Sequence, residues 1–257
     1  MSVPKADYSV IASGYDQGRL LPDETIGHWV GLIRDRGRLT PGSLCLDLGC
    51  GTGRFTIPIV QMTGARAVGA DLSGEMLAQA ASKVATNQVF WVQSDAEGLA
   101  FRHGTFDCIF MSLLLHHVDS IDRVLGECFN ALKPGGVCLV RTSAHEDMVT
   151  MPVYRFFPKA WEIDRDRLPE IVFIEDSMRR VGFAQAGHEK VTQTLVSSVD
   201  AYIDKMRRRN ISALTLLTDK ELEDGLRRME DHFRSIGDAA ALKEVAAEQL
   251  TLVIGEK

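Results

Sequence analysis

The sequence lacks an excess of positive charge and any long hydrophobic run. Its 29 Lys and Arg residues are outnumbered by 35 Asp and Glu residues, so the formal net charge is -6 at pH 7. This sign disfavours a protein that holds nucleic acid through a general positive field. No uncharged stretch is longer than residues 108–118, which are fewer than the roughly 20 apolar residues of a transmembrane helix. We therefore expect no nucleic acid and no membrane among the partners of this chain.

Paired cysteines are also missing. The five cysteines are odd in number and include no Cys-x-x-Cys motif. Such usage fits reduced thiols in a cytosol better than the disulfide framework of a secreted protein. Near the start, Lys5 and Asp7 stand where a signal peptide would carry its apolar core. We expect a cytoplasmic protein whose cysteines are small core residues.

The remaining composition is that of an ordinary globular protein. The chain has 257 residues, of which 45% are hydrophobic and 25% charged. A chain of this length can bury a large core without disulfides or metal ions. These values predict one domain over residues 1–257.

Short β-rich runs alternate with helical segments from about residue 43 onward. This alternation is typical of a parallel sheet covered by helices on both faces. The predicted strands are residues 43–49, 65–71, 88–95, 106–112, 137–142 and 249–257. The sequence therefore predicts an α/β fold with a doubly wound, mostly parallel sheet.

Two helices are clear from their apolar periodicity. Apolar residues recur at helical spacing over residues 121–132, and Asp119 or Ser120 can cap the start of this helix. A second stripe over residues 171–181 ends at Gly182, a residue suited to the left-handed conformation at a helix end.

Two segments interrupt the alternation and are predicted to be insertions that form a cap. Residues 143–169 contain three prolines and predict an irregular segment, whereas residues 197–247 are helical, with a capping box at residues 218–221. The aromatic residues within 154–161 could line an apolar substrate pocket or could simply pack the insertion.

A glycine-rich loop follows the first predicted strand. Gly49, Gly51 and Gly53 stand at alternate positions after Asp47. Without β-carbons the backbone can turn sharply and approach a ligand closely, at the sheet edge where open α/β folds bind ligands. The dinucleotide fingerprint would need a glycine where Arg54 stands, and no Gly-Lys-Ser/Thr of a P-loop follows.

Further landmarks follow in order along the chain. Asp71 ends the second predicted strand, Ser-Asp-Ala at residues 94–96 follows the third, and Leu-Lys-Pro-Gly-Gly at residues 132–136 precedes the fifth. With the glycine loop, these features resemble the class I S-adenosylmethionine-dependent methyltransferases of the small-molecule type. The resemblance implies a Rossmann-like sheet of seven strands and S-adenosylmethionine as cofactor, with S-adenosylhomocysteine as product.

The resemblance also implies roles for residues at the strand ends. Asp71 would accept hydrogen bonds from both ribose hydroxyls, although an aspartate here could instead only cap the following helix. Leu72 and Met76 would cover the adenine face. Asp95 and Ala96 would meet the adenine edge through a carboxylate and a backbone amide.

Other predicted cofactor residues lie in the glycine loop, after the fourth strand and in an N-terminal helical lid over residues 1–40. Asp47 would lie near the ammonium group of the methionine, and a tyrosine or arginine of the lid would reach its carboxylate. The members of this set are Tyr15, Arg19, Asp47, Gly49, Cys50, Gly51, Gly53, Ser112 and His117.

The candidates for a general base are His116 and His117, which follow the fourth strand at the same sheet edge. An imidazole can accept a proton near neutral pH. The same pair could equally form a loop-to-helix joint without catalytic function. No metal site is predicted, because His-Glu-Asp at residues 145–147 lacks the second histidine of an HExxH motif at Val149.

These observations predict methyl transfer to an oxygen, nitrogen or carbon of a small metabolite by in-line displacement. The alternative is a non-catalytic S-adenosylmethionine-binding or scaffold protein with the same fold. A nicotinamide-dependent oxidoreductase is disfavoured by Arg54. The oligomeric state stays open, with a homodimer as one option.

Overall fold

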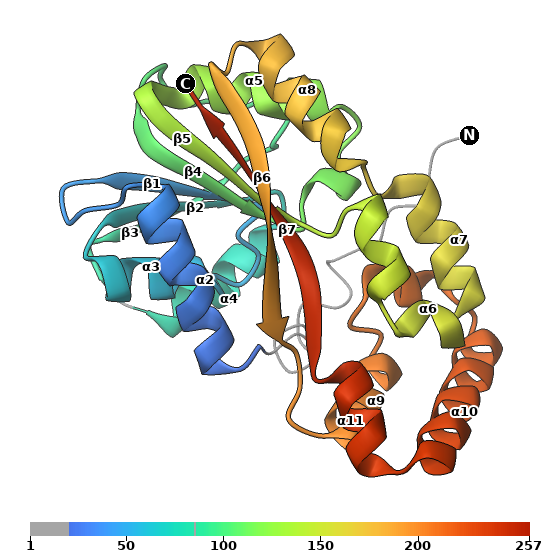
Figure 1. Ribbon diagram of the computed structural model, residues 1–257. Helices are drawn as coiled ribbons and strands as arrows, with labels where there is room; N and C mark the ends of the chain where they lie inside the picture. Colours follow the sequence, from blue (N-terminus) through green and yellow to red (C-terminus); the bar gives the residue numbers. More distant parts are fainter. Residues whose placement is uncertain (1–20, 85) are drawn as a thin grey trace. The chain divides into compact units, whose positions relative to one another are not determined.

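A single sheet organises the part of the chain that the computed structural model describes, residues 21–84 and 86–257. Within these residues, seven strands are arranged in the order β3-β2-β1-β4-β5-β7-β6 (Figure 1). The strands are β1 Leu44–Leu48, β2 Arg66–Asp71, β3 Val89–Gln93, β4 Phe106–Ser112, β5 Leu132–Thr142, β6 Gln185–Thr194 and β7 Ala247–Glu256. The strand order reverses between β1 and β4, which is the point where open α/β sheets bind ligands.

Most neighbouring strands run in parallel. β1 pairs in parallel with β2 and with β4, and β5 pairs in parallel with β4. β7 is antiparallel to β5, with Val137 opposite Glu256 and Thr142 opposite Thr251. The predicted doubly wound, mostly parallel seven-stranded fold is therefore confirmed.

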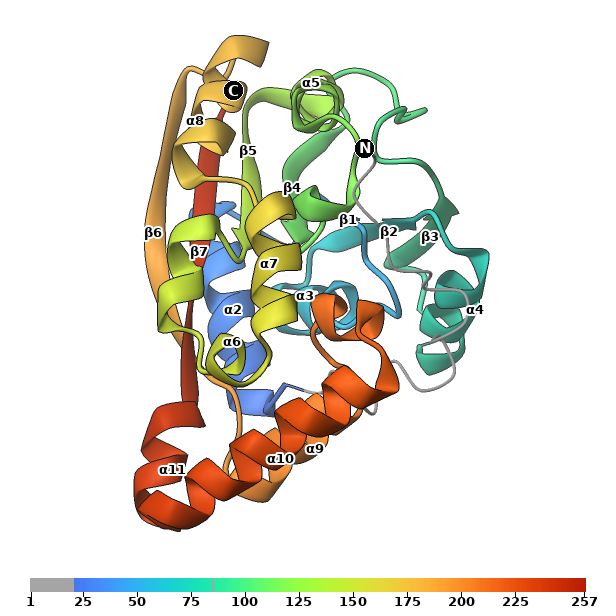
Figure 2. The ribbon, with the colours of Figure 1, turned by 90° about the vertical axis from the view of Figure 1, so that its right-hand side faces the viewer.

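Helices cover both faces of this sheet. The helices α2 (Asp23–Arg36), α3 (Thr56–Thr63) and α4 (Gly74–Lys83) lie on one face. On the other face, α5 (Ile121–Ala131) and α8 (Ile171–Val181) lie side by side (Figures 1 and 2). No helix among the described residues is long and apolar enough to cross a membrane.

The ends of α5 and α8 follow the sequence signals. At the start of α5, the hydroxyl of Ser120 accepts a hydrogen bond from the backbone N–H of Arg123 at 3.2 Å. At the end of α8, Gly182 has φ 118°, which a residue with a β-carbon adopts only with strain. Both helix predictions are confirmed.

The strand that the sequence did not reveal is β6, at the edge of the sheet. An edge strand has few buried positions, so it does not show the apolar pattern on which strand prediction depends. Instead β6 carries polar side chains that contact neighbours: Glu189 lies 2.6 Å from Arg36, and His188 lies 2.6 Å from Glu175.

The chain divides into two compact units. One contains residues 26–142, 169–190 and 251–257, and with them most of the sheet. The other, called the helical unit here, contains residues 143–168 and 191–250 together with the described residues before Ile26. Its elements are η3 (His145–Thr150), α6 (Val153–Phe156), α7 (Pro158–Arg167), α9 (Val199–Arg207), η4 (Ser212–Leu216), α10 (Asp219–Ile236) and α11 (Asp238–Val245).

The prediction that residues 143–169 are irregular is wrong. They form η3, α6 and α7, and two of the three prolines that suggested a loop stand at helix starts. Pro152 is the N-cap of α6, and Pro158 opens α7. A proline costs nothing there, because the first backbone N–H groups of a helix have no partner within it.

Aromatic packing holds the helical unit together. The rings of Phe156 and Phe233 meet edge to face at 5.6 Å between centroids, and Tyr202 packs on Phe233 at 6.3 Å. The capping box of α10 is confirmed: the backbone N–H of Thr218 donates to the carboxylate of Glu221 at 2.8 Å. Burial of one helix face against these rings fixes the position of α10 within the unit.

All five cysteines are free and buried. Their expected place in the hydrophobic core is therefore confirmed. No disulfide contributes to the stability of the sheet.

A glycine of α10 makes room for an aromatic ring. A β-carbon on Gly225 would lie 2.1 Å from Cε1 of Phe157, which is only 1% exposed. We expect Gly225→Ala to lower the free energy of unfolding by about 1–3 kcal/mol, because the core must shift. Urea denaturation followed by circular dichroism measures the change.

The matched control is Gly126→Ala in α5. Its added β-carbon would meet only Cγ1 of Val181, at an ordinary 3.9 Å. Alanine favours a helix over glycine by about 0.5–1 kcal/mol, so this variant should be neutral or more stable. Equal effects of the two substitutions would contradict the packing argument.

Candidate functional site

The glycine loop joins β1 to α3 beside the reversal of strand order. Gly49, Gly51 and Gly53 have φ angles of 72°, 54° and 78°. All three lie in the left-handed region, where a β-carbon causes strain. The alternate spacing of the glycines thus reflects three backbone positions that need them.

Asp71 fastens this loop to the end of β2. One oxygen of its carboxylate accepts a hydrogen bond from the backbone N–H of Gly51 at 2.8 Å, and the other accepts from Ser73 at 2.9 Å. The N-cap of α4 is Ser73, whose hydroxyl accepts from the N–H of Met76 at 3.2 Å. Asp71 is therefore more than a helix cap, because it links two neighbouring loops.

Trp91 of β3 supports the same loop from the sheet, a role that was not predicted from the sequence. Trp91 lies opposite Gly69 of β2 in the strand register. A β-carbon on Gly69 would lie 2.4 Å from the indole, and one on Gly53 would lie 2.7 Å from it. A glycine inside a strand signals such a close approach, and Gly69 was the available sign.

Asp47 is buried beneath the loop and is only 2% exposed. The pKa of its carboxyl is raised to about 7, chiefly by burial and also by the nearby charge of Asp71, while a hydrogen bond from Thr56 and the charge of Arg54 oppose the rise. The hydroxyl of Thr56 donates to this carboxyl at 2.5 Å. The group can therefore exchange a proton near neutral pH.

The loop after β3 is shaped by its acidic residues. The carboxylate of Asp95 accepts from the backbone N–H of Glu97 at 2.9 Å, which closes a tight turn around Ala96. Glu97 in turn accepts from the N–H groups of Asp119 and Ser120, at 3.1 and 2.8 Å. Glu97 was not predicted, yet it ties this turn to the start of α5.

The two apolar candidates near β2 differ in exposure. Leu72 is 68% exposed directly after Asp71, whereas Met76 is 2% exposed within the core. An exposed leucine offers apolar surface to a ligand, and a buried methionine offers packing only.

His116 and His117 lie in a single turn of 3-10 helix, η2 (Leu115–His117), after β4. Their ring centroids are 4.0 Å apart and both side chains are half-buried. The residue before this turn, Leu114, packs on the glycine loop, where a β-carbon on Gly49 would lie 2.9 Å from it. The histidines therefore follow a segment that contacts the loop.

Ser112 at the end of β4 belongs to a buried cluster. Arg141 of β5 donates to the Ser112 hydroxyl at 2.9 Å. The Arg141 guanidinium carbon lies 4.7 Å from the ring centroid of Trp29 and 5.4 Å from that of Phe55. Arg141 is 2% exposed, so the structure places it in the core and not at a surface where a substrate enters.

Two of the predicted cofactor residues, Tyr15 and Arg19, lie outside the described residues. Among the residues that the structure does describe, no group of three His, Cys, Asp or Glu side chains could hold a metal ion. Asp147 is buried and accepts a hydrogen bond from the N–H of Ala144 at 2.9 Å.

Comparison with known proteins shows which protein family part of this chain resembles. Residues 46–140, which contain the glycine loop and both histidines, match the family model described as a methyltransferase domain. This segment is therefore similar to a methyltransferase domain. The resemblance that the sequence showed is thereby confirmed for this segment.

The curated relatives are methyltransferases of small metabolites by name. The ubiquinone/menaquinone biosynthesis C-methyltransferase UbiE of Methylococcus capsulatus is 35% identical over 118 residues, which are 44% of this chain and 48% of the relative. The demethylmenaquinone methyltransferase of Lactiplantibacillus plantarum is 28% identical over 206 residues, 72% of this chain and 86% of the relative. The chain spans about half the length of the UbiE proteins it matches.

Solved methyltransferase structures share the fold. A putative methyltransferase from an antibiotic biosynthesis pathway of Anabaena variabilis has TM-score 0.78 and 19% identity, covering 93% of this chain and 99% of its own. A Haemonchus contortus phosphoethanolamine N-methyltransferase, solved with S-adenosyl-L-methionine, has TM-score 0.63 and 18% identity, covering 98% of this chain and 57% of its own.

The buried carboxyl of the methyltransferase domain predicts a pH dependence of stability. Asp47 has its ordinary pKa of 3.8 when unfolded and about 7 when folded, so unfolding between these values releases a proton. Stability should therefore fall as pH rises from 5 to 8. Relative to Asp47→Asn, the free energy of unfolding should fall by about 2–3 kcal/mol over this range.

Urea denaturation of the two proteins at several pH values measures the difference. Asparagine keeps an oxygen for the Thr56 hydroxyl and cannot ionise, which makes it the matched reference. A difference in stability that does not change with pH would show that Asp47 titrates normally.

Proposed function

We propose that this protein is an S-adenosylmethionine-dependent methyltransferase that acts on a small molecule. The observation that carries the proposal is the joint made by Asp71 and the glycine loop at the reversal of strand order, within the segment that matches the methyltransferase family. The methyl group would pass to an oxygen, nitrogen or carbon of the acceptor by in-line displacement.

The described residues fit the nucleoside part of this cofactor. Each carboxylate oxygen of Asp71 accepts one backbone N–H and retains lone-pair capacity for a ribose hydroxyl. Leu72 exposes an apolar side chain next to it for the adenine face. Asp95 and Ala96 would meet the adenine edge, while buried Met76 would support the start of α4 rather than touch the ring.

The methionine part would face the glycine loop and Asp47. The ammonium group of the ligand would favour the ionised form of this carboxyl, because opposite charges stabilise one another in a buried site. Gly49, Gly51 and Gly53 would keep the backbone free of side chains there. We also propose contacts from Cys50 and Ser112, and from Tyr15 and Arg19 of an N-terminal lid.

The cofactor, when bound, supplies a methyl group activated by its sulfonium. Holding the nucleophile in line with it accounts for most of the rate, since well-oriented groups reach effective molarities of roughly 10⁵–10⁸ M. We propose that His116 or His117 accepts the proton of an oxygen or nitrogen nucleophile, with His117 also neighbouring the cofactor.

The names of the curated relatives support a small metabolite as acceptor. The chain as a whole would act as one domain over residues 1–257, with a lid at residues 1–40 and a cap built from residues 143–169 and 197–247. A cytoplasmic location is supported by five free thiols. A homodimer stays a prediction.

Calorimetry with S-adenosylhomocysteine tests the role of Asp71. An asparagine at this position must turn its NH₂ group toward one of the two backbone N–H donors, and it removes the charge. We expect Asp71→Asn to weaken binding by at least about tenfold. The control Asp122→Asn changes an exposed aspartate paired with Arg180 and should bind normally.

Two results would contradict the proposal. One is the absence of S-adenosylhomocysteine binding by the unchanged protein at millimolar ligand. The other is an affinity for NADH as high as that for S-adenosylmethionine, which would restore the oxidoreductase hypothesis.

The histidines are tested with an acceptor found by screening metabolite fractions with methyl-labelled S-adenosylmethionine. If the acceptor must lose a proton, either His116→Asn or His117→Asn should lower kcat by about 10²–10⁴ and remove the acidic limb of its pH profile. Affinity for S-adenosylhomocysteine should stay within about twofold of that of the unchanged protein if the histidine acts only as a base.

Unchanged kcat in both histidine variants would assign the pair a structural role. If no metabolite fraction is methylated, the non-catalytic alternative is favoured.

A further inference from the structure

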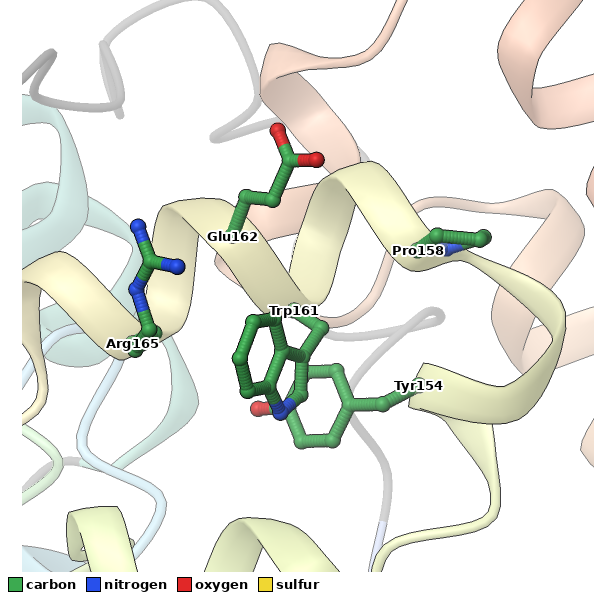
Figure 3. A pocket seen from close by; sticks show the side chains of 5 residues that line it. All are labelled: Tyr154, Pro158, Trp161, Glu162 and Arg165. Atoms are coloured by element: carbon green, nitrogen blue, oxygen red, sulfur yellow. The ribbon is translucent and has the colours of Figure 1, made fainter.

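A cavity of about 320 Å³ opens within the helical unit, on α6 and α7 (Figure 3). Its lining residues are Tyr154, Pro158, Trp161, Glu162 and Arg165. This volume is at the small end of the range for small-molecule sites. None of these residues belongs to the methyltransferase segment, so the inference goes beyond the proposed function and does not rest on it.

The apolar walls of this cavity are flat rings. Trp161 is 39% exposed, an unusual position for so large an apolar side chain, and Tyr154 is 9% exposed. The proline ring of Pro158 adds a third apolar surface. Flat aromatic walls favour planar ligands, because ring faces stack with little loss of conformational entropy.

A buried network holds one of these walls in place. The hydroxyl of Tyr154 donates to the carboxylate of Asp164 at 2.8 Å, and Arg167 donates to the other oxygen of that carboxylate at 2.6 Å. Arg167 also donates to the hydroxyl of Ser212 at 2.5 Å. Asp164 is 2% exposed, so this network is shielded from solvent and the tyrosine ring is pre-organised.

A guanidinium group lies beside the aromatic walls. The guanidinium carbon of Arg165 lies 5.2 Å from the ring centroid of Trp161. Its Nε and Nη2 lie 2.9 and 2.8 Å from one oxygen of Asp166, while Nη1 makes no hydrogen bond to any residue that the structure describes. That edge of the guanidinium can bind an anion.

The acidic lining residue faces elsewhere. In Figure 3 the carboxylate of Glu162 points away from Trp161 and Tyr154. It lies 2.7 Å from the ammonium of Lys159, which neutralises it locally. Both charged lining residues are therefore paired, Glu162 with Lys159 and Arg165 with Asp166, and the guanidinium of Arg165 still has a donor edge for a ligand.

We propose that this cavity binds a small planar aromatic anion. The ring of the ligand lies against Trp161 and Tyr154, and its carboxylate accepts hydrogen bonds from Arg165. The volume of the cavity suits one or two fused rings.

Calorimetry of the full chain without S-adenosylmethionine tests this site with three probes of one shape. These are 2-naphthoate, the neutral 2-naphthalenemethanol and the cationic 2-naphthylmethylammonium. We expect the naphthoate to bind about tenfold more tightly than the alcohol, because a hydrogen bond between charged partners is stronger than one to a neutral group. The ammonium probe should bind most weakly.

Variants separate the aromatic contribution from that of the charge. Trp161→Ala should weaken all three probes, and Arg165→Gln should abolish the preference for the naphthoate over the alcohol. The control Arg179→Gln removes an exposed arginine paired with Asp176 on α8 and should leave binding unchanged. Circular dichroism melting shows whether each variant remains folded.

The proposal is overturned by any of four results. These are no naphthoate binding at millimolar concentration, equal affinity for naphthoate and alcohol, tightest binding of the ammonium probe, or normal binding by folded Trp161→Ala. Because no cofactor is added, failure of S-adenosylhomocysteine binding in the earlier experiment would leave this outcome unaffected.

Discussion

The candidate cofactor site depends on the close approach of the glycine loop to the sheet. Trp91 fills the space above Gly69 and beside Gly53, so a β-carbon at either glycine would overlap its indole. At Gly51 of the same loop, the backbone N–H donates a hydrogen bond to the carboxylate of Asp71. The loop is thus fixed by van der Waals contact with Trp91 and by a hydrogen bond to a charged carboxylate. Both interactions would be lost if the loop backbone moved away from the sheet by about one ångström.

Bringing the loop so close places two carboxyl groups near one another. Asp47 is buried, and the nearby charge of Asp71 adds to the cost of ionising it, although the hydroxyl and a backbone N–H of Thr56 bind its carboxyl. The buried partner therefore holds its proton up to about pH 7. A positively charged ligand group bound beside this carboxyl would replace the proton and favour the ionised form.

The sequence predicted what depends on backbone conformation and missed what depends on side-chain packing. Positive φ angles need glycine, so the loop could be recognised from Gly49, Gly51 and Gly53 alone. Helix caps such as Ser120 and strand β4 followed equally local rules. Edge strand β6 carries no apolar pattern and could not be seen. The contacts of Trp91 need a pairing register that no local pattern contains.

The cavity of the helical unit could not be predicted from the sequence, because it depends on side-chain packing. The unit contains a buried charged pair, Asp164 and Arg167, whose side chains are each 3% exposed. Burial of such a pair costs desolvation energy that the attraction barely offsets, so it stabilises the unit less than it restricts its geometry. The pair fixes the hydroxyl of Tyr154, and thereby one wall of the cavity. Asp164 and Arg167 stand three positions apart on α7, and in a sequence such a pair looks like solvent-exposed surface. A cofactor loop made of backbone can therefore be recognised in advance, whereas a pocket made of side chains emerges only from the folded chain.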